Sequence, residues 1–199
     1  SPVTFWVSKD SGSEDAIAYV IQSGLGLPDE AYYREEAHAE TLSAYEKHVA
    51  EMLEFLDPAR LFGLGAEVAA HRIVSLEKEL AAGHWDVVST RDAVKTYNPC
   101  EFSELPTMTR ALLSGGNLPE HRVVNMMPSY LEHFESLFTS ERMADWQLWA
   151  TWHILRSRAA MLPEEVGAKN FEFYGTKLSG ATQQRDRWKR AVGLAESLV

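Results

Sequence analysis

The residues best suited to metal chemistry in this 199-residue chain are its seven histidines, so their spacing is the first question. A zinc hydrolase that binds its metal from one helix face needs two histidines one helical turn apart, with a glutamate between them to activate water. No two histidines here have that spacing: they are His38, His48, His71, His84, His121, His133 and His153. We therefore predict no metal site in this chain. We expect the imidazoles to be solvated or locally hydrogen-bonded. Ligands donated by distant segments stay an alternative.

Carboxylates are the next candidates, because pairs of them can serve as general acid and base. Glu35-Glu36-Ala37-His38 supplies one Glu-x-x-His pair of the kind that di-iron bundles use twice, but no second copy is present. No apolar neighbourhood that would raise a pKa surrounds the acidic runs. We interpret them as solvated helix faces: Glu35, Glu36, Glu40, Glu77 and Glu79.

Nucleophile and nucleotide motifs are missing as well. The sequence has no Gly-x-Ser-x-Gly elbow, phosphate loop or dinucleotide fingerprint, and Gly24-Leu25-Gly26 followed by Pro28 indicates a plain turn. Cys100 is the only cysteine, so no disulfide can form within the chain, and we interpret it as a bystander thiol. We predict no catalytic and no cofactor-binding residue in this chain. Trp146, Trp149 and Trp152 could line a groove, but their spacing favours the core.

Composition limits the partners. The net charge of -10 has the wrong sign for a surface that must neutralise phosphates, so nucleic acid is an unsuitable partner. No apolar run is long enough for a membrane span, and no basic segment followed by an apolar one opens the chain. The lone cysteine fits a reducing compartment, and we expect a cytoplasmic protein.

The segments that must position these residues are mostly helical. Residues 3–22 predict a β-hairpin, and the apolar run 123–126 predicts one short strand. Apolar residues at helical spacing predict a helix that ends at Asp57-Pro58 and another over 66–82 with Gly83 as its stop. Short helical turns are expected after Thr90 and Pro106. Further helices are predicted from Pro128 through Phe138, from Ser140 as N-cap through Leu162, between Pro163 and Gly180, and around Trp188, Val192, Leu194 and Leu198. The last of these has no stop signal, which predicts that the polypeptide continues.

We therefore expect a mainly α fold, a multi-helix lobe over residues 1–199 with the small N-terminal hairpin packed on it. At this length the chain can form one large domain or two closely packed lobes.

Several segments together resemble one known family. Its first signature is the block Gly24, Leu25, Gly26, Leu27, Pro28, Asp29 with Tyr32 and Tyr33 after it. Matching blocks follow in order: Tyr97-Asn98, Pro128-Ser129-Tyr130, Phe171 to Tyr174, then Leu178, Ser179, Gly180 and finally Arg187, Trp188. The chain is similar over nearly its whole length to the neprilysin and endothelin-converting enzyme family of zinc metalloendopeptidases, which includes bacterial PepO-type enzymes.

The resemblance implies that zinc binding and enclosure of the active site belong to two different lobes. Members of the family have two mainly helical lobes around a cavity, and the lobe that follows this segment carries the zinc. This chain resembles the cap lobe, so we expect it to enclose the active site and restrict substrates to small peptides, with zinc present only in the full-length protein. Its expected partners are the catalytic lobe of the same polypeptide and small peptide substrates. None of the family's catalytic or metal roles can be carried over to a residue here.

The sequence also departs from the family pattern. Glu30 and Ala31 stand where many members carry Arg-Asp, Asp186 replaces a common proline, and Ala191 stands where animal ectoenzymes place a disulfide cysteine. These departures favour a bacterial member without disulfides. The alternative function is a stand-alone helical protein-interaction module that shares the cap's fold.

Overall fold

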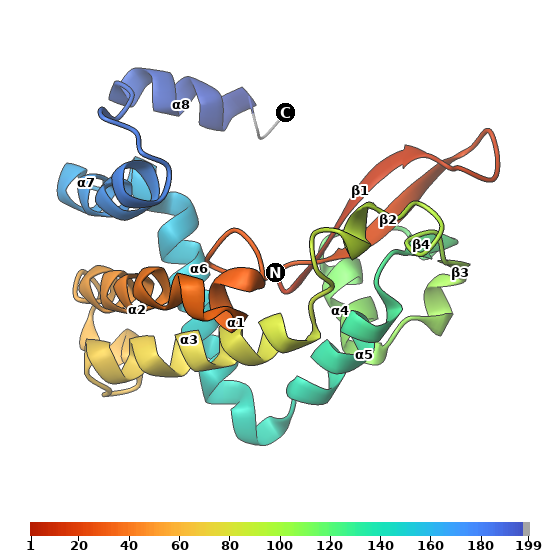
Figure 1. The fold of residues 1–199 in the computed structure, drawn as a ribbon, viewed down its shortest axis with the longest axis horizontal. Helices are drawn as coiled ribbons and strands as arrows, with labels where there is room; N and C mark the ends of the chain where they lie inside the picture. Colours follow the sequence, from red (N-terminus) through yellow and green to blue (C-terminus); the bar gives the residue numbers. More distant parts are fainter. Residues whose placement is uncertain (197–199) are drawn as a thin grey trace. The chain divides into compact units, whose positions relative to one another are not determined.

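The computed structural model describes residues 1–196 and is mainly α-helical, as the sequence predicts (Figure 1). The chain divides into two compact units. The first comprises Ser1–Ala39 and Ser75–Trp146, and the second comprises Glu40–Val74 and Gln147–Val199. We call them the sheet unit and the helical unit. Leu198 of the last predicted helix lies outside the described residues.

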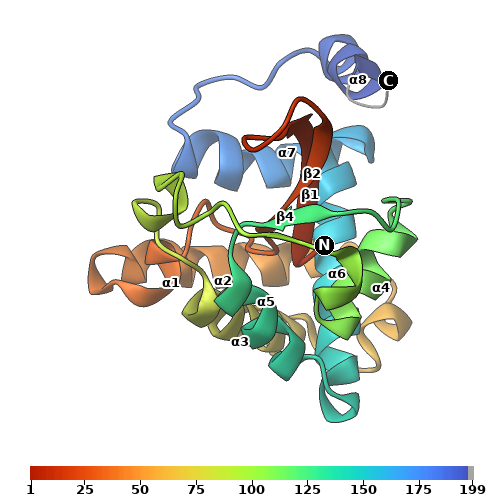
Figure 2. The same cartoon turned by 90° about the vertical axis from the view of Figure 1, so that its right-hand side faces the viewer.

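The predicted hairpin forms the first half of a four-stranded sheet with the order β1-β2-β4-β3. Strand β1 (Val3–Lys9) pairs antiparallel with β2 (Ala16–Gln22), with Val3 opposite Gln22. Strand β4 (Val123–Asn125) pairs parallel with β2, and β3 (Pro99–Cys100) pairs antiparallel with β4. Figure 2 shows the same elements from the side. The apolar run at 123–126 correctly indicates β4. The two residues of β3, one of them a proline, carry no strand pattern and were not predicted.

The hairpin loop is fixed by a side chain from another segment. The hydroxyl of Tyr97 donates to Oδ1 of Asp10 at 2.7 Å, and this hydrogen bond is the main reason that the pKa of Asp10 is lowered. The neighbouring Asn98 accepts a backbone hydrogen bond from Asn125 at the end of β4. The Tyr97-Asn98 block therefore joins the hairpin loop to the parallel strand.

Helices complete the sheet unit. They are α1 (Ala31–Arg34), α4 (Thr107–Gly115) and α5 (Pro128–Leu137), and α4 lies against β1 and beside α5 in both views (Figures 1 and 2). Apolar side chains of strand and helix form a common core, because each element buries one face. Among the buried residues are Val20, Val124, Tyr130, Leu131 and Phe134.

The helical unit is formed by the remaining helices. Their bounds are α2 (Ala39–Leu53), α3 (Ala66–Gly83), α6 (Met143–Arg158), α7 (Glu164–Phe171) and α8 (Arg187–Glu196), and α3 and α6 also contribute residues to the sheet unit. After Phe171 the backbone continues as a π-helix, Glu172–Leu178. The core of the unit holds Tyr45, Leu53, Ile73, Leu148 and Trp152.

Several boundaries differ from the prediction. Ser140 is not the N-cap of α6: it opens a 3₁₀ turn, Ser140–Arg142, and its hydroxyl bonds to Glu141 instead of a backbone amide. Helix α2 ends at Leu53, before the predicted stop at Asp57, and Asp57 is the N-cap of a separate turn (Pro58–Leu61). Trp146, Trp149 and Trp152 are buried, as their spacing indicates. Among residues 1–196, none of the helices combines the length and apolarity that crossing a bilayer demands.

Candidate functional site

The first candidate site is built on the signature block 24–33, and its centre is the hydroxyl of Tyr33. This hydroxyl donates to Oε2 of Glu77 at 2.7 Å and accepts from the backbone amides of Gly26 and Leu27, each at 3.0 Å. Burial is the main cause that raises the pKa of Tyr33, and the Glu77 carboxylate adds to it. The tyrosine therefore stays protonated and holds the glycine-rich loop against α3.

The loop is also anchored on its other side. The guanidinium of Arg34 donates to the backbone carbonyls of Ala81 and His84. The imidazole Nε2 of His84 lies 3.2 Å from the carbonyl of Ser23, and the hydroxyl of Tyr130 donates to the same carbonyl at 3.0 Å. Burial lowers the pKa of His84 to about 4, so this ring is neutral at neutral pH. The segment at 22–34 is thus held by its own Arg34 and by the side chains of His84 and Tyr130 from other parts of the sheet unit.

Between the loop and the segment after α3 lies an open cleft, which we call the signature cleft. Its volume is about 290 Å³, and it is lined by Gln22, Ser23, Gly24, Leu25, Leu27, Pro28, Asp29, Glu30, His84, Trp85, Val87 and Thr90. Its two walls are tied together by Gln22, whose side-chain amide donates to the carbonyl of Trp85 and accepts from its backbone N–H, both at 2.8 Å. The cleft is therefore a fixed feature of the sheet unit.

Gly24 is required at the entrance of this loop by its conformation. Its φ of 99° lies in the region that side chains rarely adopt. The signature glycine is explained by backbone geometry and not by chemistry.

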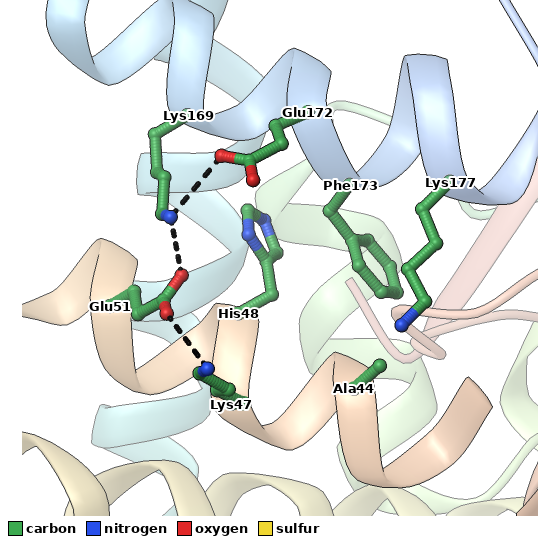
Figure 3. Close-up of a pocket in the computed structure, with 8 residues that line it drawn as sticks. All are labelled: Ala44, Lys47, His48, Glu51, Lys169, Glu172, Phe173 and Lys177. Atoms are coloured by element: carbon green, nitrogen blue, oxygen red, sulfur yellow. Dashed lines mark hydrogen bonds and ion pairs between the residues drawn. The ribbon is translucent and has the colours of Figure 1, made fainter. Parts of the chain in front are cut away.

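A second candidate site lies in the helical unit around His48 (Figure 3). This pocket of about 170 Å³ is lined by residues of α2, α7 and the π-helix: Ala44, Lys47, His48, Glu51, Lys169, Glu172, Phe173 and Lys177. The imidazole of His48 stacks on Phe173 with 4.8 Å between ring centroids. Burial lowers the pKa of His48 to about 4, so it carries no charge at neutral pH.

Most charges around the His48 pocket neutralise one another. The ammonium of Lys169 lies 2.6 Å from Glu51 and 3.2 Å from Glu172, and Lys47 lies 3.8 Å from Glu51 (Figure 3). Lys177 also lines the pocket and lies on the far side of Phe173 from Glu172 (Figure 3). The Lys169–Glu51 ion pair joins α7 to α2, while the buried Nε2 of His48 has no hydrogen-bond partner within the described residues.

The later signature residues are structural in the same way. Gly180, with a φ of 68°, ends the π-helix, and the hydroxyl of Ser179 donates to the carbonyl of Tyr174 at 2.7 Å. Leu178 is the last residue of the π-helix. Arg187 donates to the carbonyls of Met161 and Leu162 at 3.0 and 3.2 Å, which attaches the start of α8. Trp188 is 65% exposed.

The interpretation of Glu77 as solvated is wrong, and the interpretation of the histidines as solvated or locally hydrogen-bonded needs refinement. Glu77 was expected on a solvated face, but it is fully buried, because Tyr33 reaches it from the signature loop. Glu35, Glu36 and Glu40 are exposed as predicted, and Glu79 forms a bidentate ion pair with Arg142. Among the histidines, His48 and His84 are buried and not solvated. His71 and His133 are hydrogen-bonded locally, to Glu46 and to the carbonyl of Glu79.

The remaining candidates are the Cys100 thiol and the possible metal ligands. Burial raises the pKa of the Cys100 thiol, which is the opposite of what a reactive thiolate needs. Across residues 1–196, no group of three or more His, Cys, Asp and Glu side chains is arranged to hold a metal ion. The described side chains therefore do not fit a zinc ion.

Comparison with known proteins gives consistent matches over the whole chain. Residues 1–199 match the family model described as peptidase family M13. Neprilysin-2 of Drosophila melanogaster is 29% identical over 191 residues, which are 88% of this chain and 24% of that protein.

Solved structures match along the same length. Mycobacterium tuberculosis zinc metalloprotease Zmp1, in complex with an inhibitor, is 39% identical with a TM-score of 0.85, covering 100% of this chain and 31% of that one. Zmp1 in an open state is 40% identical with a TM-score of 0.83 and coverage of 100% and 32%. PepO from Lactobacillus rhamnosis shares the fold, with 20% identity, a TM-score of 0.80 and coverage of 99% and 32%. The chain thus spans about a quarter to a third of the length of these proteins.

Proposed function

We propose that this chain, which belongs to peptidase family M13, forms the enclosing lobe of a zinc metalloendopeptidase whose catalytic lobe lies elsewhere in the same polypeptide. The family that the signature blocks indicate is confirmed by the match over residues 1–199. That match is the observation that carries the proposal. An independent interaction module is disfavoured, because relatives named as zinc metalloproteases match the whole chain.

Zinc would supply the activated water and the Lewis acid of such an enzyme when bound to the catalytic lobe. The described residues of this chain do not form a ligand set for it, so we assign them no part in the chemical step. Their proposed contribution is geometric: a lobe that closes over a cavity excludes bulk water and admits only chains small enough to enter. The preferred substrates are therefore small peptides.

The rigidity of the sheet unit supports an enclosing role. A lobe can limit access only if its own loops hold their shape, and the Tyr33, Arg34 and Gln22 hydrogen bonds fix the signature loop to α3 and to the segment that follows it. The same bonds explain why the signature residues here are conformational and not reactive.

The experiment that tests the proposal compares the full-length protein with this chain alone. We expect the full-length protein to cleave a short fluorogenic peptide, to lose that activity with a chelator and to regain it with zinc. This chain alone is expected to be inactive. Zinc-dependent cleavage by this chain alone would contradict the proposal.

A second comparison tests enclosure itself. The cleaved sequence is placed in an exposed loop of a stable folded protein, and its cleavage is compared with that of the free peptide. We expect the free peptide to be cleaved and the folded carrier to resist until it is denatured. Equal rates for the two substrates would argue against size selection.

A further inference from the structure

We propose that the signature cleft binds a guanidinium or ammonium group of a basic side chain on a peptide or polypeptide, and that Glu30 is the residue that receives it. This site is independent of the proposed peptidase activity. It lies wholly in the sheet unit and is formed by residues 22–30 and 84–90.

The observation that carries the proposal is the state of Glu30. The residue is only 6% exposed, yet its side chain makes no hydrogen bond or ion pair with any residue of the described chain. Its carboxylate oxygens are not among the fully buried side-chain atoms without a partner in residues 1–196, so they meet solvent although most of the residue is covered. Carboxylates held in such a place normally have a counter-charge or N–H donors beside them. Here the carboxylate lines an open cleft, so a partner can reach it from outside.

The nearest basic side chain in sequence does not fill this role. Arg34, one helical turn after Glu30, directs its guanidinium to the carbonyls of Ala81 and His84. His84 also lines the cleft, but burial keeps its ring neutral at neutral pH. Within residues 1–196, Glu30 therefore has no cationic partner.

The rest of the lining suits a long basic side chain. Asp29, next to Glu30, uses Oδ1 to accept from the backbone N–H of Ala31 and adds a second negative charge. Trp85 also lines the cleft, its indole is held by a hydrogen bond from Nε1 to the hydroxyl of Ser129 at 2.7 Å, and indole rings attract cations. Leu25, Leu27, Pro28 and Val87 supply apolar surface for the methylene stem.

The chemistry favours an organic cation over a metal ion. A divalent ion requires several oxygen, nitrogen or sulfur ligands, and the described residues contain no group of three or more that could hold one. A guanidinium needs only one or two carboxylate oxygens and a stacking surface, and both are present. The overall charge of -10 also attracts basic ligands.

The test uses the full-length protein and two matched probes. N-acetyl-arginine amide carries the guanidinium, and N-acetyl-citrulline amide has the same shape without the charge. Binding is measured by isothermal titration calorimetry. We expect the arginine probe to bind at least about tenfold more tightly than the citrulline probe, because an ionised partner strengthens the hydrogen bonds.

Variants locate the site. Glu30→Gln keeps the shape and removes the charge, so it should weaken the arginine probe by at least about tenfold, whereas Glu30→Asp should keep the preference for arginine over citrulline. Glu36→Gln is the control, since Glu36 is exposed and lies outside the cleft. Circular dichroism confirms that each variant is folded. The comparison of the two probes on the wild-type protein needs no variant.

The outcomes also distinguish a cation on an external peptide from a basic side chain of the same polypeptide. Selective binding of the arginine probe that is lost in Glu30→Gln supports an external peptide. No binding, together with a melting temperature that falls in Glu30→Gln but not in Glu30→Asp or Glu36→Gln, supports a basic side chain from the rest of the polypeptide. Equal binding of both probes, or no binding with unchanged melting temperatures in all variants, overturns the proposal.

Discussion

The indole Nε1 of Trp152 donates to the hydroxyl of Tyr45 at 2.8 Å, and neither side chain has any exposure to solvent. This bond joins α2 and α6 at the centre of the helical unit. Both side chains are large and apolar apart from these atoms, so the bond lets two aromatic residues be buried without an unsatisfied polar group.

Tyr45→Phe should destabilise the protein by about 1–3 kcal/mol, because it leaves the buried Trp152 N–H without this acceptor. Lys169→Met is the contrasting change: its ion pairs with Glu51 and Glu172 are partly exposed, and we expect a loss below about 1 kcal/mol. Urea unfolding of each variant measures the difference. A larger loss from Lys169→Met than from Tyr45→Phe would contradict this ranking.

Tyr33→Phe should be more destabilising than Tyr32→Phe, although the two residues are neighbours. The Tyr33 hydroxyl bonds to buried Glu77 and to two backbone amides. Tyr32 stacks on His38, and its hydroxyl makes no hydrogen bond within residues 1–196. We expect about 1–3 kcal/mol from Tyr33→Phe and a few tenths from Tyr32→Phe. Thermal unfolding tests this, and equal losses would show that the signature tyrosine is not the anchor of the loop.

Gly83→Ala should destabilise the sheet unit, because a Cβ at this position would collide with the ring of His133. His133 has limited freedom to retreat, since its Nε2 is bonded to the carbonyl of Glu79 at 2.7 Å. Gly115→Ala is the matched control at the end of another helix, where a Cβ meets nothing within 4 Å.

For Gly115→Ala we expect no loss and a gain of up to about 1 kcal/mol from helix propensity. Chemical denaturation of the two variants gives the comparison. Similar effects at both positions would be inconsistent with the close approach of α3 and His133.

Acid should weaken the folded state through His48. Burial lowers its pKa from 6.5 to about 4, so between these values the unfolded chain binds a proton that the folded chain does not. The contribution to stability is present above pH 6.5 and is lost as the pH falls towards 4. A full loss amounts to a few kcal/mol.

The free energy of unfolding, measured by urea titration across this pH range, should therefore fall less steeply in His48→Gln than in the wild type. His71→Gln is the control, because His71 is exposed. A wild-type slope that is unchanged in His48→Gln would rule out this histidine as the source.

The helices were predictable because the signal for each lies within its own residues. The apolar stripes of α2 and α3 and the stop at Gly83 depend on local spacing and backbone preference. The pairing of β2 with β4 and the existence of β3 were not predictable, since they depend on which distant segments meet.

The site shows the same division. The Gly24 to Tyr33 block was recognised from the sequence, but its physical role depends on Glu77, which lies 44 positions from Tyr33. Local pattern indicates a solvated face for Glu77 because Lys78 and Glu79 follow it in a charged run. The burial of Glu30 likewise depends on how the chain folds, which no local pattern reveals.

The parallel pairing of Ala18 with Val123 has a consequence for synthesis on the ribosome. The hairpin emerges early, but its neighbour β4 emerges only after residues 40–74, which belong to the helical unit, have been made. Strand β2 cannot pair with β4 before β4 has been made, and closing a loop of this length then costs conformational entropy. The edge of β2 that later pairs with β4 therefore stays unpaired while residues 40–74 are translated. An unpaired strand edge can bind to other chains during this time.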